Sequence, residues 1–351
     1  MTISSGRIAL LEYRRTFRRR VALILVLSAA GALSFLADLM TGPSGLGLEE
    51  TLAALFHTSG VSRTAEVIVW QVRLPMSAMA LLVGAALALA GAEMQTILGN
   101  PLAEPFTLGV SYCAALGAAV AIVLGVALPL VPSGWTISAF AFAFALASLG
   151  AIHALARLRG ADRQTLILFG IAVGFTAGAL LSLLQFMASA DALQQLVFWT
   201  MGSLARSNAH SVPVVLAVLV VCVPFSLAAS WRFTVLRLGE ERARSLGIDV
   251  DRLRTAALLR IGLLSAISVA FVGVIGFVGL VGPHIARMLV GEDHRFLLPA
   301  SMAVGALVML VASIAAKMII PGVLIPIGVV TALVGLPVFF ALVLRRQGGQ
   351  R

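Results

Sequence analysis

Long apolar runs separated by short polar segments are the main pattern along the chain. A helix that crosses the hydrocarbon core of a bilayer needs roughly 20 apolar residues, and only helices and closed barrels satisfy their backbone hydrogen bonds there. The runs lack the alternation of apolar and polar positions that is typical of a barrel strand. We therefore predict an all-α polytopic membrane protein. The ten predicted spans are residues 21–39, 76–98, 107–130, 134–156, 165–187, 212–230, 258–275, 277–291, 296–316 and 325–344.

Three stretches of this map need separate treatment. Residues 258–291 allow two interpretations, either one long bent segment or two short spans that meet near Gly276. Residues 40–75 contain several acids and helix-breaking residues, so we expect an outer loop with room for a short surface helix. Residues 188–211 carry apolar side chains at helical spacing, which indicates a helix that lies along the membrane interface.

Composition favours a single membrane domain. The chain has 351 residues, of which 60% are hydrophobic and 11% charged, whereas ordinary soluble domains are about 25% charged. A soluble fold of this length could not bury so much apolar side chain. The spans leave little chain for a soluble domain, so we treat residues 1–351 as one transmembrane domain. Cys113 and Cys222 lie in apolar runs, and no disulfide framework is expected.

The distribution of charge predicts the orientation in the membrane. Basic residues collect on cytoplasmic loops, which accounts for the net charge of +10 without a nucleic-acid partner. With ten spans and the N-terminus inside, 21 of the 25 basic residues lie on the inner side, mainly in a basic N-terminus (1–20) and a large inner loop (231–257). Both termini are therefore predicted to be cytoplasmic. The basic residues left outside are Arg63, Arg73, Arg206 and Lys317.

The large inner loop is the most charged part of the chain. Its charges alternate in sign, and Gly239 and Gly247 separate short helical stretches. One interpretation is a solvated connector. The other is a docking surface for a cytoplasmic protein, in which Ala243, Leu246 and Ile248 form an apolar centre within a charged rim.

Glycines repeat every four residues in the fifth predicted span, at Gly170, Gly174 and Gly178. These positions share one face of a helix. Small residues let helix backbones approach closely, which favours tight packing. The alternative is a smooth wall for a bulky solute, because a face without side chains leaves space.

Ionisable residues are scarce inside the predicted spans. Glu93 lies near the inner end of the second span, and a carboxylate at membrane depth is a functional candidate unless it reaches water or an arginine. We place no other acid well inside a span. Ion-driven carriers hold ionisable groups near the middle of the membrane. The scarcity therefore argues against ion coupling and points to energy supplied from outside the bilayer.

Catalytic and metal-binding motifs are missing from the sequence. It contains no HExxH, GxSxG or Walker A motif. The five histidines are scattered without the spacing of metal ligands. We therefore expect a transport subunit rather than an enzyme, with no cofactor or metal bound by this chain.

Four stretches resemble one known family in the same order. They are RLPMSAMALLVGAALALAGAEMQTILGNPLAEPFTLGV (73–110), GEERARSLGI (239–248), GFVGLVGPHIARMLVGEDHRFLLP (276–299) and IPIGVVTALVGLPVFF (325–340). On these motifs the chain resembles the FecCD-like permease subunits of type II ABC importers, which take up iron–siderophore complexes, haem and vitamin B12. The likeness runs from about residue 20 to the C-terminus.

The resemblance implies an assembly of several subunits. It would contain two permease subunits, here as a homodimer, two ATP-binding subunits that use ATP and Mg, and a periplasmic substrate-binding protein. The inner loop would form coupling helices on the ATP-binding subunits. The matching residues are Gly239, Glu240, Glu241, Ala243, Arg244, Leu246 and Gly247.

The resemblance also implies a pathway and a docking site. Asn100 and Leu102 match the loop that narrows the cytoplasmic gate, with Gln164 from the next inner loop. The fifth span resembles the pathway-lining helix, which favours the open-wall interpretation of its glycines, and we count Glu93 with the pathway. The positions that match basic residues for the binding protein's acids are Arg73 and Lys317.

Two positions depart from the family pattern. Met76 stands where the family often has arginine, so docking would use fewer charges. Glu93 replaces a residue that is usually apolar, and it could pair with an inner arginine or touch a cationic cargo. We expect a multi-pass permease of the bacterial inner membrane, with iron–siderophore as the leading cargo, haem second and vitamin B12 third. The competing class is a stand-alone secondary carrier or a membrane enzyme.

Overall fold

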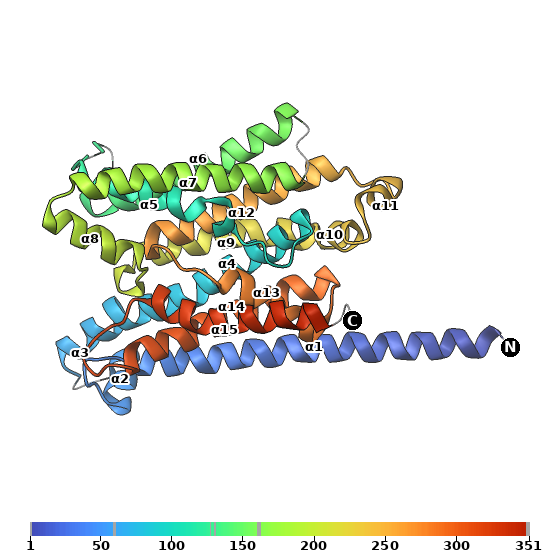
Figure 1. Cartoon of the computed structure of the whole chain (residues 1–351). Helices are drawn as coiled ribbons and strands as arrows, with labels where there is room; N and C mark the ends of the chain where they lie inside the picture. Colours follow the sequence, from blue (N-terminus) through green and yellow to red (C-terminus); the bar gives the residue numbers. More distant parts are fainter. Residues whose placement is uncertain (1, 59–60, 127, 130, 160–162, 349–351) are drawn as a thin grey trace.

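The computed structural model describes residues 2–58, 61–126, 128–129, 131–159 and 163–348 (Figure 1). These residues form a helical bundle without a β-strand. The long helices are α1 (Thr2–Met40), α4 (Leu74–Leu98), α5 (Val110–Val123), α6 (Thr136–Arg159), α7 (Arg163–Met187), α9 (Ser211–Ala228), α12 (Val250–Val272), α13 (Val278–Val290), α14 (His294–Met318) and α15 (Ile327–Gly348). The short helices are α2 (Leu48–Leu55), α3 (Arg63–Val67), α8 (Ala190–Thr200), α10 (Ser230–Leu236) and α11 (Glu240–Ser245), with single turns at Pro105–Leu108, Ser133–Trp135 and Leu204–Arg206.

Each predicted span corresponds to one long helix, which confirms the all-α membrane fold. In the described parts of the chain, seven helical segments are long and apolar enough to cross a membrane. Helices α5, α13 and α15 add three shorter apolar segments. Helix α1 begins at Thr2, so the basic N-terminal segment continues the first span as helix.

Helix α4 lies at the centre of the bundle. Nearly all its side chains are buried, and it packs against α12, α13 and α14. Gly91 lies so close to Gly279 at the start of α13 that an added Cβ would overlap the Gly279 carbonyl. In Figure 1, α6 and α7 lie at one edge of the bundle and α1 lies at the other. The interior therefore consists mainly of contacts between α4 and the C-terminal helices.

The two ends of the bundle carry different elements. One end, called the basic end below, carries α10, α11 and the turns that join them to α9 and α12. The opposite end carries α2, α3 and α8 (Figure 1). The N-terminal end of α1 and the C-terminal end of α15 both lie at the basic end in Figure 1. This arrangement fits a topology in which both termini lie on one side of the membrane.

The ambiguous stretch 258–291 consists of two helices. Helix α12 ends at Val272 and is followed by Gly273, whose φ of +77° is a conformation that favours glycine. Helix α12 also begins within the predicted inner loop 231–257, because the Asp249 side chain accepts a hydrogen bond from the Arg252 backbone N–H and caps the helix. The connection between the spans is therefore shorter than the predicted inner loop 231–257, because α12 begins at Val250.

The two segments predicted outside the spans both contain helices. Residues 40–75 hold α2, α3 and a π-helical segment, Ile68–Arg73, and helix is continuous from α3 through α4. Residues 188–211 hold α8, whose first turn is capped by Ser189. Arg73 therefore lies within a helix rather than in the predicted outer loop.

Candidate functional site

The surface predicted to couple to ATP-binding subunits consists of α10, α11 and the adjoining turns. Gly239 and Gly247 flank α11 with φ of +113° and +79°, conformations that favour glycine. Leu246 is 64% exposed and Ile248 is half-buried. Ala243 is fully buried. The prediction that Ala243 contributes to the exposed apolar centre is wrong, because its side chain packs inside the subunit and anchors α11.

One ion pair holds α11 against α12, and a second lies within α11. Glu240 accepts a hydrogen bond from Arg254 at 2.7 Å and another from Arg244 at 3.4 Å. Arg254 belongs to α12 and is largely buried. A helix of this length is not stable alone, so its position depends on these contacts. Glu241 remains exposed.

A second polar network joins the basic end to α4. Glu292, in the turn after α13, pairs with Arg237 at 2.9 Å and with Arg287 at 3.1 Å. Arg287 also donates a hydrogen bond to Gln95 Oε1 of α4 at 2.9 Å. The charge pattern of the sequence predicts only that these arginines lie on the inner side of the membrane. The structure shows that they link α10, α13 and α4 through side chains.

His294 forms a further link at the same end. Its Nε2 lies 2.7 Å from Thr96 Oγ1 of α4, and its Nδ1 lies 3.3 Å from Thr234 Oγ1 of α10. Within the ranges that the structure describes, no three His, Cys, Asp or Glu side chains gather into a possible metal site. His294 therefore joins three helices rather than serving as one of a set of metal ligands.

Glu93 is part of a buried ion pair. Its carboxylate accepts hydrogen bonds from Arg260 Nε at 3.1 and 3.2 Å and from Nη2 at 2.9 Å. Glu93 is 0% exposed. Arg260, near the start of the predicted span 258–275, belongs to α12 and faces α4. Of the expectations for Glu93, pairing with an arginine is the one found, and Glu93 lines no open pathway in this structure.

Arg73, a predicted docking residue, is buried at the opposite end. Its Nη1 donates to the Met40 backbone oxygen at 3.1 Å and to Thr51 Oγ1 at 3.1 Å, and its Nη2 donates to Ser44 Oγ at 2.9 Å. The carbonyl groups at the C-terminal end of a helix carry partial negative charge that attracts a cation. Arg73 therefore fastens the end of α1 to the π-helical segment before α4.

Lys317, the other predicted docking residue, is also buried. Its Nζ lies 2.8 Å from Asp38 Oδ1 and donates to the Asp38 backbone oxygen at 2.9 Å. Ser77 donates to Asp38 Oδ2 at 2.6 Å. The expectation of two exposed docking charges is therefore wrong for this structure, because both cations bind the end of α1. Arg63 is exposed at the same end.

The glycines of α7 face a neighbouring segment rather than open space. An added Cβ at Gly174 would lie 3.0 Å from the nearest backbone atom, and one at Gly178 would lie 3.4 Å from an aromatic ring. Tight packing accounts for this face, and the open wall expected from Gly170, Gly174 and Gly178 is absent in this conformation. The residues that fill the space are Leu108, Gly109 and Tyr112.

The other side of α7 carries bulky apolar residues instead. Leu168, Phe175 and Phe186 are all exposed, and Phe175 has 75% of its surface free. These positions lie on one stripe of the helix. Sequence reasoning gave them no role, because apolar residues are expected throughout a span. In the single subunit they form an uncovered apolar surface.

The gate loop follows α4 at the basic end. Asn100 Oδ1 accepts a hydrogen bond from the Leu102 backbone N–H at 3.0 Å, which stabilises the turn. Gln164 is exposed at the start of α7. The chain just before it, residues 160–162, lies outside the described residues. The structure therefore positions Asn100 and Leu102 together, and no described contact adds Gln164 to them.

Glu104, in the same loop, is a further candidate that the sequence reasoning missed. Its carboxylate accepts a hydrogen bond from the Phe277 backbone N–H, at the start of α13. Burial raises the pKa of Glu104 to about 7 despite this bond. The Glu104 carboxyl group therefore joins the gate loop to the start of α13.

Comparison with known proteins places this geometry in context. Residues 29–345 match the FecCD transport family. The uncharacterized ABC transporter permease protein YvrB of Bacillus subtilis is 39% identical over 286 residues, covering 81% of this chain and 80% of that protein. The vitamin B12 import system permease protein BtuC of Salmonella typhi is 37% identical over 333 residues, covering 95% and 98%. A solved transporter of the metal-chelate ABC type, in an inward-facing conformation, is 33% identical with a TM-score of 0.81, covering 92% and 99%.

Proposed function

The chain belongs to the FecCD transport family of ABC importer permeases, and from this premise we propose that it is the membrane subunit of an ATP-driven importer for an iron chelate. Permeases of this family are transport subunits and not catalytic enzymes. The observation that carries the proposal is the match over residues 29–345, combined with the TM-score of 0.81 to a metal-chelate type transporter. Iron–siderophore complexes are the first cargo class that we propose.

Vitamin B12 is the second candidate cargo. The relative BtuC is named for vitamin B12 import and aligns over 95% of this chain. Both candidates are bulky metal chelates, so the two proposals share one chemical class. Haem is the third candidate, and no described contact selects it over the other two.

The proposed energy source is a pair of ATP-binding subunits at the basic end. Leu246 would enter their surface, with Glu241 and Arg244 in the polar rim around it. The network from Arg237 through Glu292 would carry motion of α10 toward α4. A cleft of about 340 Å³ between this network and the gate loop, lined in part by Arg237, Glu292 and Pro101, leaves room for such movement. Asn100 and Leu102 would then open or close the inner end of the pathway.

The competing class, a stand-alone secondary carrier, finds less support. Glu93 pairs with Arg260, and Asp38 pairs with Lys317. Ion-coupled carriers need such groups free to bind and release an ion.

We further propose that the apolar stripe of α7 packs against a second copy in a homodimer, and that a substrate-binding protein docks at the opposite end.

Co-purification and reconstitution test the proposal. We expect the chain to co-elute with an ATP-binding subunit and to support ATP-dependent uptake of a ferric siderophore only when that subunit and a binding protein are present. Leu246→Glu should abolish co-elution, because it places a charge in the apolar centre. Arg15→Gln, on an exposed position of α1, serves as the matched control and should not.

Uptake by the chain alone in liposomes would contradict the proposal. Competition assays then identify the cargo within the class. Inhibition of uptake by excess cyanocobalamin, without inhibition by ferric siderophores, would replace the iron chelate with vitamin B12 and leave the importer assignment intact.

A further inference from the structure

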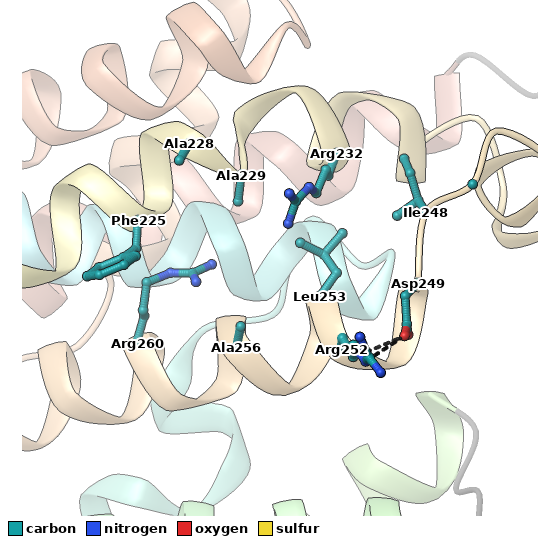
Figure 2. Close-up of a pocket in the computed structure, with 11 residues that line it drawn as sticks. Phe225, Ala228, Ala229, Arg232, Ile248, Asp249, Arg252, Leu253, Ala256 and Arg260 are labelled. Carbon is teal, nitrogen blue, oxygen red and sulfur yellow. Dashed lines mark hydrogen bonds and ion pairs between the residues drawn. The ribbon is translucent and has the colours of Figure 1, made fainter.

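A second cleft lies beside α11, between the α9–α10 segment and α12. Its volume is about 620 Å³, and Figure 2 shows residues from both walls pointing into it. Arg232 comes from α10, and Arg252 and Arg260 come from α12. Gly247 and Ile248 of the coupling surface form part of its lining, and none of the roles proposed above gives the cleft itself a ligand.

The charge of the cleft is basic. Asp249 is the acid that lines it, and it pairs with Arg252 at 2.9 Å. Glu93 holds Arg260 from the far side. Arg232 is exposed and, among the described residues, has no ion pair. The cleft therefore has three guanidinium groups and two carboxylates around it, which leaves one positive charge for an anionic ligand.

Most charged groups lie toward the basic end of the cleft, and apolar groups lie toward the middle of the bundle. Helix α9 runs toward the basic end, so Phe225 precedes Arg232 along that wall, and Val221 lies one helical turn before Phe225, outside the lining of the cleft. Val221 and Phe225 share one helix face, and they are 58% and 63% exposed. Leu253 adds apolar surface from α12. A ligand that fills this space would need an anionic head near the basic end and an apolar tail toward the middle of the bundle.

We propose that this cleft binds the headgroup of an anionic phospholipid, with its acyl chains along Val221 and Phe225. Arginine suits this ligand because its planar fork donates two hydrogen bonds to a phosphate. Basic pockets between membrane helices on the cytoplasmic side are suited to anionic headgroups. Free phosphate would satisfy the arginines but would leave the apolar wall without a partner. The proposal does not depend on the transport function.

Lipid retention by the purified chain tests this assignment. The detergent-solubilised protein would be incubated with phosphatidylglycerol or phosphatidylcholine of equal chain length, and bound lipid would be counted by native mass spectrometry. We expect at least about tenfold preference for phosphatidylglycerol, which corresponds to about 1.4 kcal/mol. Arg232→Gln/Arg252→Gln should lose most of this preference.

Two variants control for charge and for folding. Arg15→Gln/Arg19→Gln removes the same charge from exposed positions of α1 and should keep the preference. Arg232→Lys/Arg252→Lys keeps the charge and should retain more than half of the bound lipid. Both outcomes support the cleft as the site. If the glutamine pair in the cleft misfolds, Arg232→Gln alone removes the cleft arginine that has no ion pair among the described residues and should lower the preference, and an unchanged preference would overturn the proposal.

Several results would overturn the proposal. Equal loss from the cleft variant and the α1 variant would show general attraction to the basic end. Displacement of bound phosphatidylglycerol by millimolar inorganic phosphate would assign the cleft to a soluble anion. Loss of the lipid when an ATP-binding subunit assembles on α11 would assign it to that protein interface instead.

Discussion

At Glu93, a single carboxylate is accommodated in the apolar centre of the bundle by one arginine. The Glu93–Arg260 pair is bidentate, because two guanidinium nitrogens donate hydrogen bonds to the two carboxylate oxygens. Removing one member of a buried pair leaves an uncompensated charge, whereas replacing both with apolar residues is often neutral. This difference separates a structural role from a role in transport.

Glu93→Leu should therefore lower the stability of the subunit by about 3–5 kcal/mol. The double variant Glu93→Leu/Arg260→Met should recover most of that loss, because neither charge remains. Thermal unfolding in detergent measures both. A double variant no more stable than Glu93→Leu would contradict the pairing. A stable double variant that fails in uptake would assign Glu93 a further role in the pathway.

The charged residues of the bundle were only partly predictable. Glu93 was identified from its position in an apolar run, but its partner lies 167 positions later in the chain. Lys317 and Asp38 are 279 positions apart. Spacing and local hydropathy contain no information about which distant helix supplies the partner. For this reason the sequence places Arg73 and Lys317 at exposed surfaces, whereas the structure buries them.

At the scale of elements, the helices were predictable because lipid demands them. A span must be apolar, long and helical, and each predicted span has its helix. The ends of the helices were predicted less accurately than their existence. Asp249 caps α12 within the predicted loop, and helix continues through Ile68–Arg73 into α4. Both features depend on single side chains and on packing. The repeated glycines of α7 could be identified in the sequence. The choice between tight packing and an open wall required the structure, which shows the segment that packs against them.

The contact between α4 and α13 offers a direct test at this scale. Gly91→Ala should destabilise the subunit by about 1–3 kcal/mol, because the added methyl group forces two backbones apart. Gly31→Ala in α1 is the matched control. Apart from the neighbouring backbone of α1 itself, no atom lies within 4 Å of a Cβ at that position, so alanine should be neutral or slightly stabilising there. Equal unfolding temperatures for the two variants would contradict the close packing of α4 on α13.

At the scale of the whole molecule, the bundle has a basic end and an opposite end with different elements. The charge pattern predicts that the basic end is cytoplasmic, and the ends of α1 and α15 lie there together (Figure 1). The surface exposed at each end can be reached by a reagent only from its own side of the membrane.

Cysteine labelling in intact cells checks this orientation. Glu49→Cys, exposed at the opposite end, should react with a membrane-impermeant maleimide. Arg15→Cys and Arg242→Cys, exposed at the basic end, should react only after the cells are opened. Cys113 and Cys222 are buried and should give little background. Labelling of all three variants in intact cells would contradict the predicted topology.

The packing of α4 also sets an order in time. Its neighbours α12, α13 and α14 are made long after it, and Arg260 follows Glu93 by 167 residues. At a synthesis rate of roughly 5–20 residues per second, α4 waits about 8–30 s for that arginine. During this interval the Glu93 side chain has no Arg260 partner, and the buried pair can form only after α12 has been made.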